Sequence, residues 1–189
     1  MASESLFRVG GIGGEMVILL SEIVLSVILY VLLKPVNQTL SLIAAVSRLA
    51  MTIIHGLNLL NYGFALLLLS GADYLTPFTT DQLQSLMMLF LDAHSFGFTI
   101  GIAFLTLHVF ILGYLIIRSG YIPRILGILF LIAASGYLID SSALLLLPNY
   151  ATPDFLALPI AVAEIAFPLW LLVKGVNTDQ WKRRAHESN

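Results

Sequence analysis

Apolar residues fill five long stretches of the chain, and polar residues gather in the short segments between them. An α-helix needs roughly 20 apolar residues to cross the hydrocarbon core of a bilayer. Each stretch reaches or approaches this length, and the second and third exceed it. The pattern therefore predicts an all-α protein, a polytopic bundle of five transmembrane helices at about residues 12–33, 42–69, 84–117, 123–147 and 156–173.

Turn-forming and helix-capping residues mark the ends of these stretches. Lys34-Pro35 closes the first one, because proline cannot continue a helix. The segment 70–81, SGADYLTPFTTD, contains turn formers followed by N-cap candidates that begin at Thr79. None of the polar segments is long enough to separate two domains. We therefore expect residues 1–189 to form a single transmembrane domain.

Composition supports the membrane class and excludes several functions. Hydrophobic residues make up 59% of the sequence and charged residues 11%, whereas a soluble domain carries about 25% charged residues. The net charge of −2 argues against a nucleic-acid partner. Because the sequence contains no cysteine, disulfides, thiolate ligands and Fe–S clusters are excluded.

Basic residues predict the orientation in the membrane. Only Arg8 falls on one side of the predicted bundle. The other side holds Lys34, Arg48, Arg118, Arg124, Lys174, Lys182, Arg183 and Arg184. By the positive-inside rule, the N-terminus lies outside and the C-terminus inside a bacterial inner membrane. An outward N-terminus without a signal is uncommon, which suggests a shortened form of a six-helix protein. A second copy or a partner helix could replace the absent first helix.

Ionisable residues inside the predicted helices are candidates for function. A charged side chain at a helix centre costs about 2.5–3.5 kcal/mol on insertion scales, so such groups should face protein or water. Counting 1.5 Å per residue places most of the acidic groups in the outer half of the bundle. We predict an outward-facing polar pocket that binds a small ligand, a lipid or a partner. Its residues are Glu22, Asn58, Asp92, His94, Asp140 and Glu164.

Three other interpretations of these groups remain open. Carboxylates and imidazole suit a divalent metal such as zinc, which would make the protein a metal-dependent intramembrane hydrolase. No HExxH motif supports this, and Asp92 and His94 point about 200° apart around a helix. The groups could also form a proton path, or simply be protonated or hydrogen-bonded across the bundle. We assign no metal ligands and favour a protein without enzymatic activity.

Two histidines suggest a haem alternative. His55 and His108 lie at equal predicted depth on neighbouring helices and could clamp a b-type haem of a redox protein. The simpler interpretation is that both are hydrogen-bonded core residues, so neither haem nor zinc is favoured as a cofactor. Near them, Gly97 and Gly101 form a GxxxG motif that allows close helix contact. We expect Arg48 to extend toward the inner membrane surface.

Short motifs along nearly the whole chain carry a family resemblance. They are YVLLKPVN, SRLA followed by GLNLLN, LDAHSFGFTIG, GYLIIRSGYIPRILG, GYLIDSS and EIAFPLWLLVKGVN. Together they resemble a bacterial family of integral membrane proteins known as a domain of unknown function, and GYLIxxSGYIPRILG is the most specific piece. The resemblance implies a six-helix fold with one helix ahead of SESLFR, and it implies no reaction. Positions within the motifs are Arg48, Asn58, His94, Arg124, Asp140 and Glu164.

Overall fold

The computed structural model describes residues 7–187, and this part of the chain is helical without strands. Five of its helices are long and apolar enough to cross a membrane, as the hydropathy pattern predicts. The protein is thus a multi-pass helical membrane protein. The five helices are α2 (Gly14–Leu33), α3 (Gln38–Leu68), α4 (Thr80–Ser119), α5 (Arg124–Leu146) and α6 (Asp154–Val173). Shorter elements are the π-helix η1 (Phe7–Gly13), the 3-10 helix η2 (Asp73–Leu75) and α7 (Thr178–Glu187).

Two helices begin earlier than hydropathy predicts because polar residues cap them. The Asn37 side chain accepts a hydrogen bond from the Leu40 amide, which starts α3 at Gln38. Thr79 and Gln82 form a reciprocal capping box at the start of α4. Side-chain oxygens at these positions satisfy amide groups that the first helical turn leaves unpaired. The polar first turns of α3 and α4 therefore extend each helix beyond its apolar stretch.

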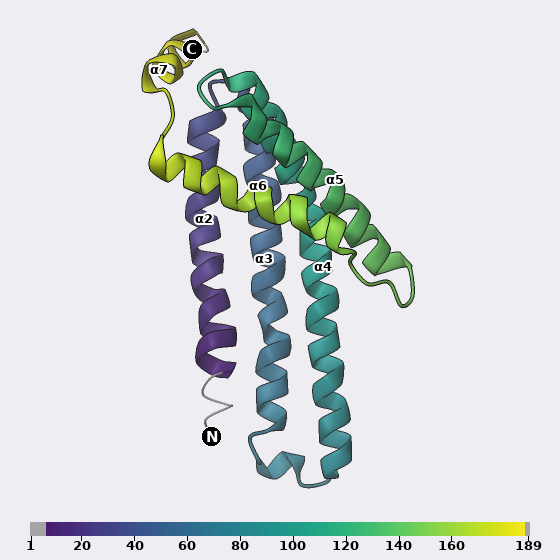
Figure 1. Ribbon diagram of the computed structural model, residues 1–189. Helices are drawn as coiled ribbons and strands as arrows, with labels where there is room; N and C mark the ends of the chain where they lie inside the picture. The colour runs from purple at the N-terminus through teal and green to yellow at the C-terminus, as the bar shows by residue number, and fades with distance from the viewer. Residues whose placement is uncertain (1–6, 188–189) are drawn as a thin grey trace.

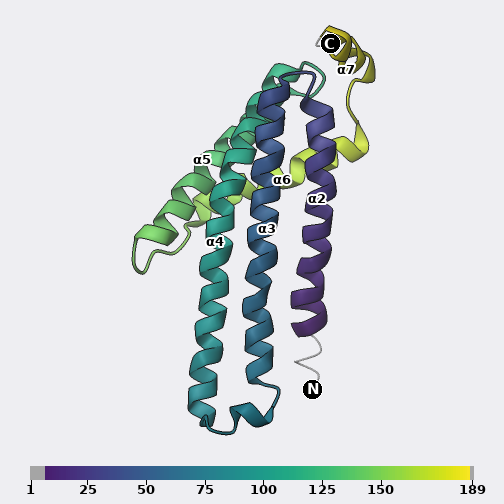
Figure 2. The same cartoon turned by 180° about the vertical axis from the view of Figure 1, so that it is seen from behind.

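Helices α2, α3 and α4 stand side by side, with α3 in the middle, whereas α5 and α6 are inclined to them (Figure 1). Helix α5 folds back along α4. Helix α6 packs mainly against α5 and crosses one face of the α2–α3–α4 layer. In the reverse view, α6 lies behind that layer (Figure 2). The oblique course of α6 determines where the cavity described below lies.

The GYLIIRSGYIPRILG segment forms the tight hairpin between α4 and α5. Gly120 ends α4 with φ of 80°, a left-handed conformation that favours glycine. The first and last residues of the segment, Gly113 and Gly127, face each other. A Cβ on Gly113 would stand 2.8 Å from the Gly127 carbonyl oxygen, and a Cβ on Gly127 2.6 Å from the Gly113 carbonyl oxygen. Both positions therefore require glycine for the two backbones to approach.

The C-terminal helix α7 is tied to the end of α2. The Tyr121 hydroxyl and the Trp181 Nε1–H both donate to the Leu32 carbonyl, at 2.6 and 2.9 Å. This carbonyl belongs to the last turn of α2, where intrahelical partners run out. Burial raises the pKa of Tyr121 to about 12, so the hydroxyl stays protonated and remains a donor.

Candidate ligand-binding site

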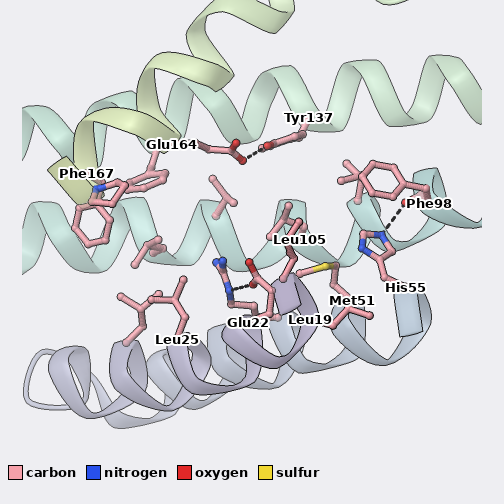
Figure 3. Close-up of a pocket in the computed structure, with 18 of the residues that line it drawn as sticks. Leu19, Glu22, Leu25, Met51, His55, Phe98, Leu105, Tyr137, Glu164 and Phe167 are labelled. Atoms are coloured by element: carbon pink, nitrogen blue, oxygen red, sulfur yellow. Dashed lines mark hydrogen bonds and ion pairs between the residues drawn. The ribbon is translucent and has the colours of Figure 1, made fainter. Parts of the chain in front are cut away.

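A cavity of about 500 Å³ lies between α6 and the layer formed by α2, α3 and α4. All five long helices contribute to its wall, which is largely apolar (Figure 3). Typical apolar contributors are Leu19, Leu25, Met51, Leu105 and Phe167. Helix α6 packs mainly against α5 and crosses the other helices obliquely, and the cavity lies beneath it.

One charged group in the cavity wall, Arg48, is held from two sides. Its Nε forms an ion pair with Glu22 of α2, and its Nη1 donates to His108 Nε2 at 2.9 Å. His108 Nδ1 donates in turn to the Ala44 carbonyl at 2.8 Å. Because the guanidinium only donates, His108 is the neutral tautomer with its proton on Nδ1. The expectation that Arg48 extends to the membrane surface was wrong, since Glu22 and His108 keep it inside the bundle.

A second acidic group faces the first across the cavity. The Tyr137 hydroxyl of α5 donates to Oε1 of Glu164 on α6, and both side chains point into the space opposite Glu22 (Figure 3). Glu164 is an exposed residue. Among residues 7–187, no Lys, Arg or His lies within ion-pair distance of its carboxylate. The wall thus holds two carboxylates and one guanidinium.

The GxxxG glycines of α4 make room for polar side chains of α3. His55 Nε2 donates to the Phe98 carbonyl at 3.0 Å, and the His55 ring stacks on Phe98 with centroids 4.5 Å apart. Asn58 Nδ2 donates to the His94 carbonyl at 2.8 Å. A Cβ on Gly101 would stand 2.1 Å from His55 Nε2, and a Cβ on Gly97 2.2 Å from Asn58 Oδ1. The motif admits hydrogen-bonding side chains between the helices.

The six residues of the predicted pocket do not form one group. Glu22 and Glu164 line the cavity. Asn58 does not line it and lies in the α3–α4 interface, where it bonds to the His94 carbonyl. His94 is buried beside Asn58, its ring stacks on Tyr62 at 3.8 Å, and its Nε2 lies 3.7 Å from Glu15 Oε2.

The other two predicted pocket residues lie elsewhere. Asp92 is exposed on α4 and does not line the cavity. Asp140 accepts hydrogen bonds of 3.1 Å from Tyr150 and Thr152 where α5 connects to α6. Depth along the sequence does not give the direction of a side chain around its helix. Because α5 is inclined to α4, counting 1.5 Å per residue also gives a wrong depth for Asp140 along the bundle relative to the residues of α4.

Haem or metal ligation would need rearrangements of these side chains. Both ring nitrogens of His108 are engaged, so ligation of a haem iron would require it to leave Arg48 or Ala44. Within the described residues no three His, Asp or Glu side chains come close enough to hold a metal ion.

Two residues that give the cavity its polar character, Arg48 and Tyr137, are absent from the predicted pocket. Nothing in the GYLIDSS motif singles out Tyr137. Arg48 shares a polar stripe of its helix with His55, seven residues away, and such a stripe is expected to face protein. That stripe, and not the expected extension toward the membrane surface, indicates where the guanidinium lies.

Comparison with known families adds to this geometry. The sequence matches the family described as "Domain of unknown function (DUF4386)" over residues 1–175. The chain belongs to the DUF4386 family. The matched region contains every helix that lines the cavity and ends before α7. The chain is also similar to an "Uncharacterized protein" of Archaeoglobus fulgidus, with 31% identity over 162 residues, which cover 86% of this chain and 82% of the relative. No solved structure matches the chain.

Proposed function

We propose that this DUF4386 protein binds an amphiphilic small molecule, taken from the lipid phase, in the cavity between α2 and α6. The observation that supports this is the combination of size and lining. Ligand sites typically enclose about 300–1,000 Å³ and have apolar walls with a few converging polar groups. The cavity has about 500 Å³, with Glu22, Arg48, His55, Tyr137 and Glu164 as its charged and polar groups.

The position of the cavity favours a ligand that is dissolved in the membrane. Arg48 follows the start of α3 by ten residues, which corresponds to roughly 15 Å along the helix, about half of the hydrocarbon thickness. A water-soluble molecule would have to cross apolar surface to reach this depth. A molecule with an apolar chain would enter from the bilayer and place its polar group among the charged side chains.

The proposal includes a bacterial inner membrane as the location, with the N-terminus outside and α7 in the cytoplasm. It is supported by the basic residues Lys34, Arg118, Arg124 and Lys174, which share the end of the bundle where α7 lies. No reaction is proposed, because binding alone accounts for an apolar cavity with a few polar side chains.

Native mass spectrometry of the protein in a non-ionic maltoside detergent tests the binding function. Dodecanol serves as a neutral probe, and we expect one molecule to bind per protein. Leu105→Trp places a larger side chain in the cavity wall and should reduce dodecanol binding at least about tenfold, which corresponds to 1.4 kcal/mol. Leu107→Trp is the matched control, because Leu107 lies on the same helix, is 48% exposed and does not line the cavity.

The outcome that would overturn the proposed function is equally specific. If dodecanol does not bind, or binds equally well to wild type and to both tryptophan variants, the cavity is not a ligand site.

A further inference from the structure

We infer that the ligand is a cationic amphiphile, a long-chain amine whose ammonium group pairs with Glu164. The inference rests on the proposed function and specifies the chemistry of the ligand. It follows from the balance of charges in the cavity wall and from which of these charges already have partners.

The guanidinium of Arg48 already has a counter-ion. Glu22 pairs with its Nε, and His108 accepts one of its Nη1 protons at 2.9 Å. Its remaining N–H groups could still donate to an anion. An anionic headgroup there would lie beside the Glu22 carboxylate and would increase the excess of negative charge in an apolar wall, which is unfavourable.

The Glu164 carboxylate, in contrast, has room for a partner. It receives one hydrogen bond, from the Tyr137 hydroxyl, and a carboxylate can accept about four. No cation of the described chain neutralises it. An ammonium group beside it would supply the missing positive charge and up to three hydrogen-bond donors. The cavity would then hold two anionic and two cationic groups.

The rest of the cavity suits the alkyl chain of such a ligand. Leu25, Leu105 and Phe167 belong to three different helices and line the space around the Glu22 and Glu164 carboxylates (Figure 3). Apolar side chains make up most of this wall, so it offers few hydrogen-bonding groups to a longer polar molecule. We therefore expect one cationic group and one apolar chain.

Three probes of equal chain length test the inference in the same maltoside solution at pH 7. Dodecylamine is cationic, dodecanol neutral and dodecanoate anionic. In wild type we expect dodecylamine to bind at least about tenfold more tightly than dodecanol, and dodecanoate to bind most weakly, since hydrogen bonds to charged groups are the stronger ones. This comparison needs no variant, so a folding defect cannot obscure it.

A pair of variants then assigns the preference to Glu164. Glu164→Gln should reduce the advantage of dodecylamine over dodecanol to within about twofold while dodecanol binding is retained. Asp154→Asn is the control, because Asp154 is an exposed acid on the same helix outside the cavity, and it should keep the full preference for the amine.

The possible results separate the two proposals. Equal binding of all three probes, or a preference for dodecanoate, would overturn the cationic ligand and leave the amphiphile-binding function in place. A preference for the amine that survives in Glu164→Gln would also overturn it. Failure of all three probes to bind would overturn the proposed function itself.

Discussion

Arg48 of α3 connects the two helices beside it, because it pairs with Glu22 of α2 and donates to His108 of α4. Its side chain is 13% exposed and that of Glu22 is 19% exposed, so water screens the pair only weakly. Breaking a buried pair by removing one partner typically costs about 3–5 kcal/mol, whereas replacing both partners costs far less.

This difference gives a prediction for a double-mutant cycle. Arg48→Gln should lower the free energy of unfolding by up to about 3 kcal/mol, because Glu22 then stays partly buried without a counter-ion. Adding Glu22→Gln should recover more than half of that loss. Thermal unfolding of the four proteins in maltoside micelles measures the coupling. Additive losses from the two substitutions would show that the ion pair does not form.

Gly101 gives a second prediction at the same scale. A Cβ there would stand 2.1 Å from His55 Nε2, so Gly101→Ala must displace the ring from the Phe98 carbonyl. We expect a loss of about 1–3 kcal/mol, the usual cost of overpacking a tight core. Gly63→Ala is the control, since a Cβ at Gly63 meets nothing within 4 Å. That variant should be neutral or up to about 1 kcal/mol more stable, because alanine favours the helix. Equal effects of both substitutions on the melting temperature would contradict the packing of His55 against α4.

At the scale of the elements, Trp181 holds α7 against the end of the bundle. Trp181 Nε1 donates to the Leu32 carbonyl, and the ring packs against the buried core. The segment carries Lys182, Arg183 and Arg184, which are trypsin sites.

Trp181→Phe should therefore release α7 and make these sites accessible. We expect trypsin to remove the C-terminus of the variant about two- to tenfold faster than that of wild type, because the lost hydrogen bond contributes about 0.5–1.5 kcal/mol. Gln180→Ala changes an exposed neighbour and should leave the cleavage rate unchanged. If Trp181→Phe is cleaved at the wild-type rate, the contact with Leu32 does not hold α7 in place.

The five long helices could be predicted from the sequence because the length of an apolar stretch is a local property. Turn and capping chemistry also predicts the N-cap at Thr79, which the structure confirms. The cap at Asn37 was not predicted, since that residue belongs to a polar segment that a hydropathy pattern assigns to a loop. The inclination of α6 could not be predicted at all. It depends on how α6 packs against α5, and no periodicity within residues 154–173 reports on that contact.

The candidate site, too, could be predicted only in part from the sequence. Glu22 and Glu164 were recognisable because ionisable groups in apolar helices require partners. The partners themselves were not, since Arg48 and Tyr137 come from helices whose relative rotation the sequence does not give. Asp140 illustrates the limit: Tyr150 and Thr152, both in the segment after α5, satisfy it locally and remove it from the cavity.

At the scale of the whole molecule, the proposed orientation makes a prediction that the chain is well suited to test, because its sequence contains no cysteine. Tyr74→Cys places a thiol in the loop proposed to lie outside, and Asp179→Cys places one in α7. A membrane-impermeant maleimide should label Tyr74→Cys in intact cells. It should label Asp179→Cys only after the cells are permeabilised. The reverse pattern would invert the topology.

Photo-crosslinking tests most directly whether the cavity between α2 and α6 is a ligand site. A long-chain alkylamine that carries a diazirine at the end of its chain is added to membranes that contain the protein, irradiated, and its adducts are located by mass spectrometry. We predict that adducts concentrate on cavity residues such as Met51, Leu105 and Phe167, and that excess dodecylamine or Leu105→Trp abolishes them. Adducts spread over the outward faces of α2 and α6, unchanged by competitor or variant, would show that the amine meets the protein only as bulk lipid does.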